Sequence, residues 1–295
     1  MTNTTSAAGG LPYALGAYLV WGLFPLYLLF VIDVPPLELV SWRAICTLPI
    51  CLAIVVALGQ TRQLGLALTN PRILGYLVVS ALLIGINWLV FIFAVQDGHV
   101  LAASLGYYIN PMVNILFGTL FLKERLSRLQ WLAVGLAGVG VAILALGALD
   151  TLWISLTLAV SFSSYGLVRK LAPVESLPGL TIETIIWLIP AVGVVAYHAM
   201  SPQGMSLGID TQTDIAILLA GIVTATPLLL FATAARRMDY SLLGFVQFLA
   251  PTLNFIFGLA IFNEHLKPAQ LGCFLCIWAA IALFSWDLFS RRKPA

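Results

Sequence analysis

Charged residues are scarce in this chain of 295 residues, since Asp, Glu, Lys and Arg make up 9% of it while hydrophobic residues make up 61%. A soluble domain carries about 25% charged residues, so this composition excludes a fold surrounded by water. The hydrophobic residues form long blocks without the alternation of transmembrane β-strands. The composition therefore predicts helices that are apolar on every face and lie in lipid.

Reactive groups are scarce as well. The four cysteines all lie in apolar blocks, and the three histidines fall in expected loops or near helix ends. Cys273 and Cys276 have CxxC spacing, but their apolar surroundings favour packing over metal or redox chemistry. There is no GxxxxGK[ST] loop, and no aspartate is expected at membrane depth. We therefore expect no ATPase domain, metal, cofactor, nucleic-acid partner or enzymatic activity.

Ten apolar blocks, each about 20 residues long, are separated by turn signals and predict ten transmembrane helices. They lie near residues 11–31, 38–58, 73–95, 101–122, 130–149, 152–171, 180–200, 215–236, 241–262 and 270–289. Suitable first-turn residues precede several of them, including Asn70 before Pro71, Ser127 with Gln130, and Asp214.

Basic residues fix the expected orientation. With the N-terminus inside, twelve of the fourteen Lys and Arg residues fall in cytoplasmic segments, while Lys267 lies in an outer loop and Arg43 within a helix. The twelve are Arg62, Arg72, Lys123, Arg125, Arg128, Arg169, Lys170, Arg236, Arg237, Arg291, Arg292 and Lys293. Because basic loops stay on the cytoplasmic side during insertion, both termini are predicted to be cytoplasmic.

The second half of the chain repeats the first at an offset of 140 residues, with seven identities in the twenty positions from 111 to 130. The matches are Pro111 and Pro251, Asn114 and Asn254, Phe117 and Phe257, Gly118 and Gly258, Glu124 and Glu264, Leu126 and Leu266, and Gln130 and Gln270. Each repeat has five helices, an odd number, so the second copy must be inverted. The sequence thus predicts an all-α membrane protein of two inverted five-helix repeats, 11–150 and 151–290, which is typical of secondary transporters.

Several strings resemble a known family. The segments are ASLGYYINPMVNILFG at 103–118, YGLVRK at 165–170, ETIIWLIP at 183–190 and LLGFVQFLAPTLNFIFG at 242–258. They resemble the RarD-type permeases of the EamA branch of the drug/metabolite transporter superfamily. This resemblance implies a bacterial inner-membrane protein that moves small metabolites or drugs, usually outward. It also implies that helices 1 to 4 and 6 to 9 surround a cavity. Such proteins are often named for chloramphenicol, a name that leaves the cargo open.

Two prolines within helices mark candidate hinges. Pro111 frees the carbonyl of Tyr107 and Pro251 frees that of Gln247, and such carbonyls persist only where protein or a water-filled cavity serves them. The alternative is a packing kink in which the nearby asparagines hold neighbouring helices together. Candidate substrate-binding residues nearby are Tyr107, Tyr108, Asn110, Asn114, Gln247 and Asn254.

Asn87 and Trp88 in the third helix are further candidates for binding substrate. An amide near the middle of a span is costly unless it is paired, so hydrogen bonding between helices is the alternative role of Asn87.

Arg43 and Glu183 occupy equivalent positions in the two repeats and are expected to be the only ionisable side chains clearly inside the spans. One interpretation has Arg43 binding an anionic group of the cargo and Glu183 acting as a proton-coupling group. In the structural alternative, Arg43 reaches the headgroups and Glu183 pairs with Arg169 or Lys170.

The sequence therefore predicts a secondary transporter working by alternating access, and most simply an exporter of small metabolites, amino-acid-like molecules or amphipathic drug-like molecules. We expect the monomer to be functional, with the proton as candidate coupling ion. The alternatives are a passive channel and a structural membrane protein without transport activity.

Overall fold

The computed structural model describes residues 4–147, 149–202, 204–261 and 268–290, and every regular element within these ranges is helical. Its helices are α1 (Thr4–Leu28), α2 (Pro36–Ala57), α3 (Thr61–Thr69), α4 (Pro71–Gln96), α5 (Val100–Leu120), α6 (Arg128–Ala145), α7 (Leu152–Leu171), α8 (Ser176–Met200), α9 (Thr211–Arg237), α10 (Tyr240–Gln247), α11 (Leu249–Ala260) and α12 (Pro268–Ser290), with short 3-10 helices η1 (Leu29–Val31) and η2 (Leu149–Thr151).

Nine helical stretches among the described residues are long and apolar enough to cross a membrane. They correspond to nine of the ten predicted spans. The remaining predicted span, at 101–122, is present as α5 with 21 residues but is not one of these nine stretches. The prediction of an all-α membrane protein is therefore confirmed.

Two features of the helical pattern differ from the prediction. The sequence predicts a loop between residues 58 and 73, because polar residues interrupt the apolar sequence there, but the structure has the short helix α3 in this segment. Its Ala67 is buried while its Arg62 is exposed. The helix predicted at 241–262 is divided into α10 and α11 at Phe248. Pro251 explains this break, because it has no N–H to donate to the carbonyl of Gln247. The loop that follows, with Glu264 and Lys267, lies outside the described residues.

The expected helix starts are found. The side chain of Asn70 accepts hydrogen bonds from the N–H groups of Arg72 and Ile73 at 3.0 and 3.3 Å. Ser127 and Gln130 form a reciprocal capping box at the start of α6.

The cap of α9 is Asp210, whereas Asp214 lies in its first turn. Hydrogen bonds from Thr213 lower the pKa of the Asp210 carboxyl. The polar residues before the apolar blocks therefore act as the sequence indicated, with the cap of α9 four residues earlier.

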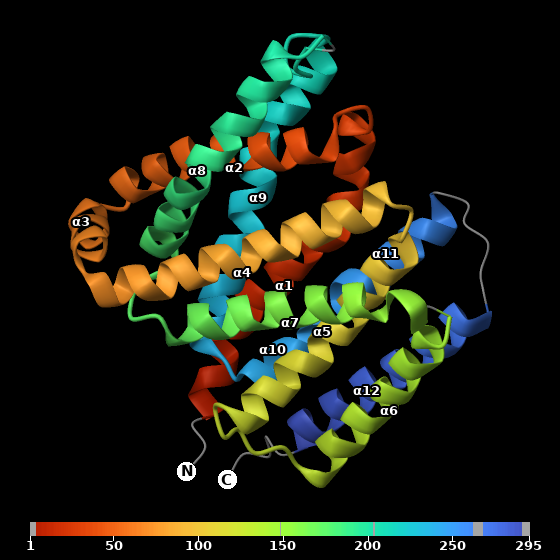
Figure 1. Ribbon diagram of the computed structural model, residues 1–295. Coiled ribbons are helices and arrows are strands. Elements are labelled where there is room, and N and C mark those ends of the chain that lie inside the picture. Colours follow the sequence, from red (N-terminus) through yellow and green to blue (C-terminus); the bar gives the residue numbers. More distant parts are fainter. Residues whose placement is uncertain (1–3, 148, 203, 262–267, 291–295) are drawn as a thin grey trace.

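The helices form a bundle in which segments from the two halves of the chain alternate (Figure 1). The start of α1 and the end of α12 lie at the same end of the bundle, which we call the terminal end (Figure 1). α1 packs against α9 and α11, α2 against α8 and α9, and α7 against α4 and α5.

α6 and α12 pack together at the edge of the bundle (Figure 1). Their close approach depends on Gly140, because a Cβ atom there would lie 2.8 Å from the carbonyl oxygen of Cys273. Cys273 and Cys276 are free thiols within this helix pair.

Buried charges are more numerous than expected. The prediction that Arg43 and Glu183 are the only ionisable side chains inside the spans is wrong, because Glu38, Arg169 and Asp287 are also buried within helices. Each has a protein partner that compensates its charge or its hydrogen-bonding groups, as burial in lipid requires. Glu38, for example, accepts hydrogen bonds from the N–H and hydroxyl of Ser206 at 2.7 and 2.8 Å, and so ties α2 to the loop before α9.

Candidate functional site

A cavity of about 600 Å³, which we call the large cavity, lies in the half of the bundle farther from the terminal end. Its walls come from the end of α1, η1, the start of α2, the second half of α4, the first half of α5, the end of α6, and parts of α11 and α12. The lining residues are Phe24, Pro25, Leu28, Leu29, Val31, Ile32, Val34, Pro36, Leu39, Val40, Arg43, Trp88, Phe91, Ile92, Val95, Ser104, Tyr108, Leu144, Asn254, Phe255 and Gln270. The wall is thus mainly apolar and aromatic, which suits a small molecule with a hydrophobic body.

Arg43 supplies the positive charge of this cavity. Its Nε donates a hydrogen bond to the hydroxyl of Thr224 at 2.9 Å. Its guanidinium carbon lies 5.1 Å from the ring centre of Phe24 and 5.7 Å from that of Trp88. No carboxylate among the described residues lies within ion-pair distance of it. Cation–π contacts therefore stabilise the guanidinium and leave it available to an anion.

The other predicted binding residues separate into two groups. Trp88, Tyr108 and Asn254 line the cavity with Arg43. Tyr107 does not, and its ring packs against Phe91 with ring centres 6.2 Å apart. The helical repeat explains the difference, because adjacent residues point about 100° apart around α5.

Asn87, Asn110, Asn114 and Gln247 are buried in hydrogen bonds between helices. The amide nitrogen of Asn87 donates to the carbonyl of Leu158 at 2.9 Å. The amide nitrogen of Asn114 donates to Oε1 of Gln247 at 2.6 Å, joining α5 to α10 beside the break before Pro251. The side-chain oxygen of Asn110 accepts from the hydroxyl of Ser163 at 2.6 Å. These hydrogen bonds between helices correspond to the structural role that the sequence left open as the alternative to substrate binding.

Pro111 and Pro251 lie in the same part of the molecule. Pro111 is inside the continuous helix α5, and Gly244 of α10 packs against its carbonyl, where a Cβ would lie only 2.8 Å away. Pro251 follows the break between α10 and α11. The second repeat therefore has a discontinuous helix where the first has a continuous one.

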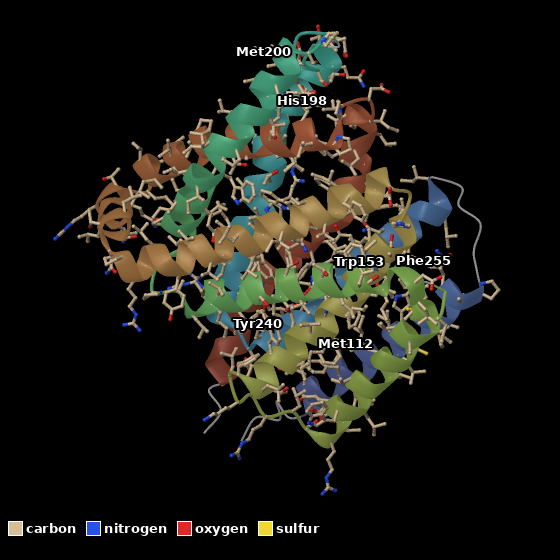
Figure 2. The ribbon with its side chains drawn as sticks, in the orientation of Figure 1. Met112, Trp153, His198, Met200, Tyr240 and Phe255 are labelled. Carbon is tan, nitrogen blue, oxygen red and sulfur yellow. The ribbon has the colours of Figure 1, made fainter. Side chains whose placement is uncertain are left out.

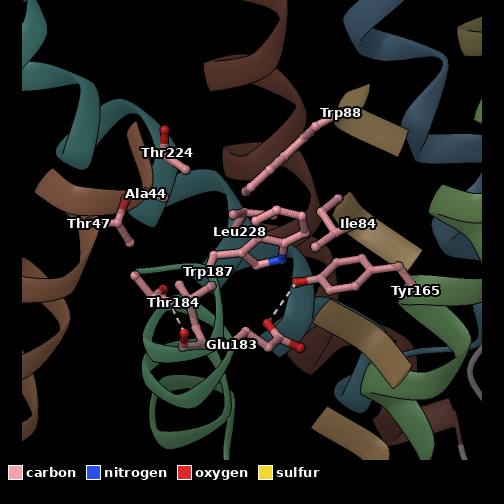
Figure 3. A pocket seen from close by; sticks show the side chains of 11 residues that line it. Ala44, Thr47, Ile84, Trp88, Tyr165, Glu183, Thr184, Trp187, Thr224 and Leu228 are labelled. Carbon is pink, nitrogen blue, oxygen red and sulfur yellow. Dashed lines mark hydrogen bonds between the residues drawn. The ribbon is translucent and has the colours of Figure 1, made fainter. Parts of the chain in front are cut away.

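Glu183 lies beside a second, much smaller cavity of about 20 Å³ (Figure 3). Its carboxylate lies 3.5 Å from Nη1 of Arg169 and accepts hydrogen bonds from the hydroxyls of Ser80 and Tyr165. Of the two partners that the sequence suggested, Arg169 is the one found. Lys170 instead donates to the carbonyls of Ala235 and Met238 at 2.8 and 2.6 Å.

Further polar contacts join the helices near the terminal end. The hydroxyl of Tyr240 donates to the carbonyl of Ser163 at 2.6 Å, and Arg236 donates to that of Ala172 at 2.8 Å. Tyr240 lies toward this end, whereas Phe255 of the large cavity lies toward the other (Figure 2).

Glu124, in the loop after α5, contributes a carboxylate to these contacts. Its carboxylate accepts from the backbone N–H groups of Tyr240 and Ser241 at 2.7 and 2.8 Å. The sequence did not single out this role, although the repeat signal included Glu124.

Proteins with similar sequences identify the family. An uncharacterized transporter of Pseudomonas aeruginosa is 42% identical over 99% of this chain and 98% of its own length. Protein RarD of Escherichia coli is 40% identical over 97% of both chains. The model of the EamA-like transporter family matches residues 8–146. This chain is a RarD-type EamA transporter.

The resemblance seen in the four sequence segments is therefore confirmed for this RarD-type protein. The uncharacterized transporter YojE of Bacillus subtilis, 39% identical over 97% of this chain and 96% of its own length, is a further relative. Membership of the family and the apolar helices establish a multi-pass membrane protein with a general role in transport.

A solved protein structure with a TM-score of 0.75 covers 96% of this chain and 99% of its own length. At 19% sequence identity, this likeness concerns the fold alone. It shows that the two chains share this fold over nearly their whole length.

Proposed function

We propose that this RarD-type protein is a secondary transporter working by alternating access, and that its large cavity is open on the outer side of the membrane. The observation that carries the proposal is the asymmetry between the two ends of the bundle. The large cavity extends to the turn at Ile32 and Val34, while polar contacts from Glu124, Lys170 and Tyr240 join the helices at the terminal end. A channel instead needs a path continuous from one side to the other.

The packing of the helices supports the inverted repeat on which alternating access would depend. Matching helices in chain order pairs α1 with α7, α2 with α8, and α4 with α9, while α5 corresponds to α10 and α11. Contacts occur in matching pairs, since α1 packs on α9 as α7 packs on α4, and α5 packs on α7 as α11 packs on α1. Two similar halves of opposite orientation can exchange outward-open and inward-open shapes around a site between them.

Orientation completes the proposal. Basic residues such as Arg62 of α3 and Lys123 after α5 belong to the loops predicted to be cytoplasmic. In the proposed orientation the terminal end faces the cytoplasm, and the large cavity opens toward the outside of an inner membrane.

Exchange measured in proteoliposomes tests this function. Liposomes preloaded with unlabelled compound should accumulate the labelled compound, and the rate should saturate, for at least one member of a panel of amino acids, aromatic carboxylates and amphenicols. Flux that rises linearly with concentration and shows no stimulation by internal substrate would identify a channel and contradict the proposal.

We further propose that the cargo carries an anionic group that binds Arg43 beside an apolar body. A charged hydrogen bond contributes about 1.5 to 3 kcal/mol, equivalent to roughly tenfold to a hundredfold in affinity. Phe24, Trp88 and Phe255 provide flat surfaces near Arg43 or in the same cavity wall. Amino-acid-like and amphipathic carboxylates combine these two properties.

N-acetylphenylalanine and its primary amide form a matched probe pair, because they differ mainly in the carboxylate. Calorimetry on the purified protein should show at least about tenfold tighter binding of the acid. Arg43→Gln should remove this preference, while Arg72→Gln, at an exposed position in α4, should keep it. Equal binding of the two probes by the parent protein, or a preference that survives Arg43→Gln, would exclude an anion-binding role.

A further inference from the structure

We infer that Glu183 is the binding site of a coupling proton, and that protonation of its carboxylate opens the cytoplasmic half of the transporter by breaking the ion pair with Arg169. The inference rests on the proposed alternating-access function and adds the identity of the coupling group. The resulting class of transport is exchange of the cargo for a proton.

The ion pair between Glu183 and Arg169 is the most deeply buried one among the described residues. The two residues are 2% and 1% exposed, whereas the side chains of the other pairs are much more exposed. Arg169 donates one hydrogen bond, to the carbonyl of Ser176 at 2.9 Å, and its Nε and Nη1 have no hydrogen-bond partner. The carboxylate of Glu183 is therefore the principal compensation for a buried and incompletely hydrogen-bonded guanidinium.

Gly179 makes room for this pair. A side chain at position 179 would overlap the guanidinium of Arg169, because a Cβ atom there would lie closer to Nη1 than any real contact allows. Gly179 and Glu183 are four residues apart on α8 and thus lie on the same face. The sequence of α8 is consequently arranged to hold Arg169 against Glu183 on that face.

The groups facing Glu183 come from four other helices. α7 contributes Arg169 and Tyr165, and α4 contributes the hydroxyl of Ser80. α2 contributes the thiol of Cys51, whose electrostatic environment includes Glu183, and α9 contributes Thr224 and Leu228 to the shared small cavity.

Among Glu183 and the groups that face it, Arg169 is the basic side chain and Glu183 is the carboxylic acid. A proton arriving here therefore binds the carboxylate of Glu183, since the guanidinium already holds its full complement of protons.

The small cavity gives the proton a route from outside. Its volume of about 20 Å³ accommodates one water molecule, for which about 10 to 15 Å³ is enough. Glu183 and Tyr165 lie on one side of it, and Trp88 and Thr224 also line it (Figure 3). Trp88 belongs to the wall of the large cavity as well, and Thr224 accepts the hydrogen bond from Arg43.

Proton transfer along this route balances without another reactant. A hydronium ion in the outer cavity gives up its proton, the single water relays it, and an O–H bond forms on Glu183. The neutral carboxylic acid then leaves Arg169 as a buried charge without a carboxylate partner, an arrangement that is strongly destabilising. Opening the cytoplasmic half relieves this cost, because water reaches Arg169 and the proton can leave to the cytoplasm.

The inverted repeat places Glu183 on the side where release is needed. Arg43 and Glu183 each lie seven residues after the first residue of their helices, Pro36 of α2 and Ser176 of α8. Arg43 lines the open outer cavity, and its repeat partner Glu183 is the group expected to line the inner cavity after the halves exchange shapes.

A cysteine reporter at Ala235 tests the proposal without requiring the cargo. Ala235 is completely buried in α9, and its carbonyl accepts from Lys170. The Ala235→Cys variant, with the four native cysteines replaced by alanine, is reconstituted in lipid nanodiscs and labelled with a water-soluble maleimide. An exposed Arg62→Cys reporter in the same background corrects for the pH dependence of the thiol reaction itself.

The corrected labelling rate should rise at least about tenfold between pH 8 and pH 5, because loss of one partner of a buried ion pair is strongly destabilising. Glu183→Gln should give the fast rate at both pH values. Glu183→Asp, which keeps an ionisable carboxyl, should restore the pH dependence, and Asp239→Asn should keep it.

A corrected rate that is the same at pH 5 and pH 8, or a pH dependence that survives Glu183→Gln, would overturn the inference. Saturable exchange by the parent protein combined with either result would reject the proton site alone. Linear, non-saturable flux would reject the alternating-access function on which the inference rests.

Discussion

Glu124→Gln should weaken the attachment of α10 at the terminal end. In the structure the two carboxylate oxygens of Glu124 accept from the N–H groups of Tyr240 and Ser241, the first residues of an eight-residue helix. Those N–H groups have no partner within the helix, and the helix dipole favours a negative charge beside them. Glutamine offers one oxygen, and its NH₂ group would face the second N–H donor.

The magnitude follows from these contacts. One charged hydrogen bond, worth about 1.5 to 3 kcal/mol, is lost and the other becomes a neutral bond of about 1 kcal/mol. Since Glu124 is partly exposed, solvent screening reduces the combined loss to roughly 1 to 1.5 kcal/mol. That energy corresponds to about a tenfold change in the equilibrium for local opening.

Hydrogen exchange followed by mass spectrometry measures this opening directly. The peptide that contains residues 240–247 should exchange about tenfold faster in Glu124→Gln than in the parent protein. Glu175→Gln is the matched control, because Glu175 is mostly exposed and pairs with Arg236 at 3.8 Å, so its loss should change exchange by less than about twofold. Unchanged protection of residues 240–247 in Glu124→Gln would refute the assigned role of the carboxylate.

Two further predictions concern charge and orientation. Asp239 keeps an exposed face, but partial burial and then the neighbouring Glu124 raise the pKa of its carboxyl, while Lys170 opposes this effect. Because the pKa of Asp239 is raised in the folded state, its contribution to the stability of the fold is present below the ordinary Asp pKa. This contribution is lost as the pH rises through the folded-state pKa. Asp239→Asn should therefore raise thermal stability at pH 8 by a few tenths of a kcal/mol, and the gain should shrink on acidification; an equal gain at all pH values would contradict it. In a cysteine-free background, Asp150→Cys and Asp210→Cys should react with impermeant reagent in intact cells while Arg62→Cys and Arg237→Cys should not, and the reverse pattern would invert the topology.

The positions of the helices were predictable because apolar block length is a direct physical requirement of the bilayer. The caps at Asn70 and Ser127 could also be predicted, since they depend on residues within one turn. The break in the helix at Phe248 could not be predicted in the same way. Pro111 and Pro251 occupy equivalent repeat positions, yet α5 continues through its proline while the second helix is divided. The surrounding packing therefore decides the outcome of the same local signal.

The sites were less predictable than the fold because helical faces depend on tertiary packing. Tyr107 and Tyr108 have similar chemistry and adjacent positions, but one lies outside the cavity and the other lines it. Asn87 satisfies its amide between helices, whereas Asn254 lines the cavity. Arg169 was assigned to a cytoplasmic segment from its place near a helix end, although its side chain is buried beneath α8. Sequence spacing gives the depth of a residue along a helix and the residues with which it shares a face, but it does not give which face points into the cavity.

An unpaired Arg43 creates an energetic problem for an exporter that the proposed proton site addresses. A cation without a carboxylate partner retains an anionic cargo in the outer cavity, by about 1.5 to 3 kcal/mol for a charged hydrogen bond. One proton entering the cell contributes about 2.3 kcal/mol for each 100 mV of membrane potential. The two quantities are comparable, so one proton per cycle at 100 mV offsets most or all of this retention. Exchange of cargo for cargo requires no net proton movement. Glu183→Gln should for this reason abolish accumulation driven by a pH gradient, and the rate of the exchange that it retains should not depend on pH.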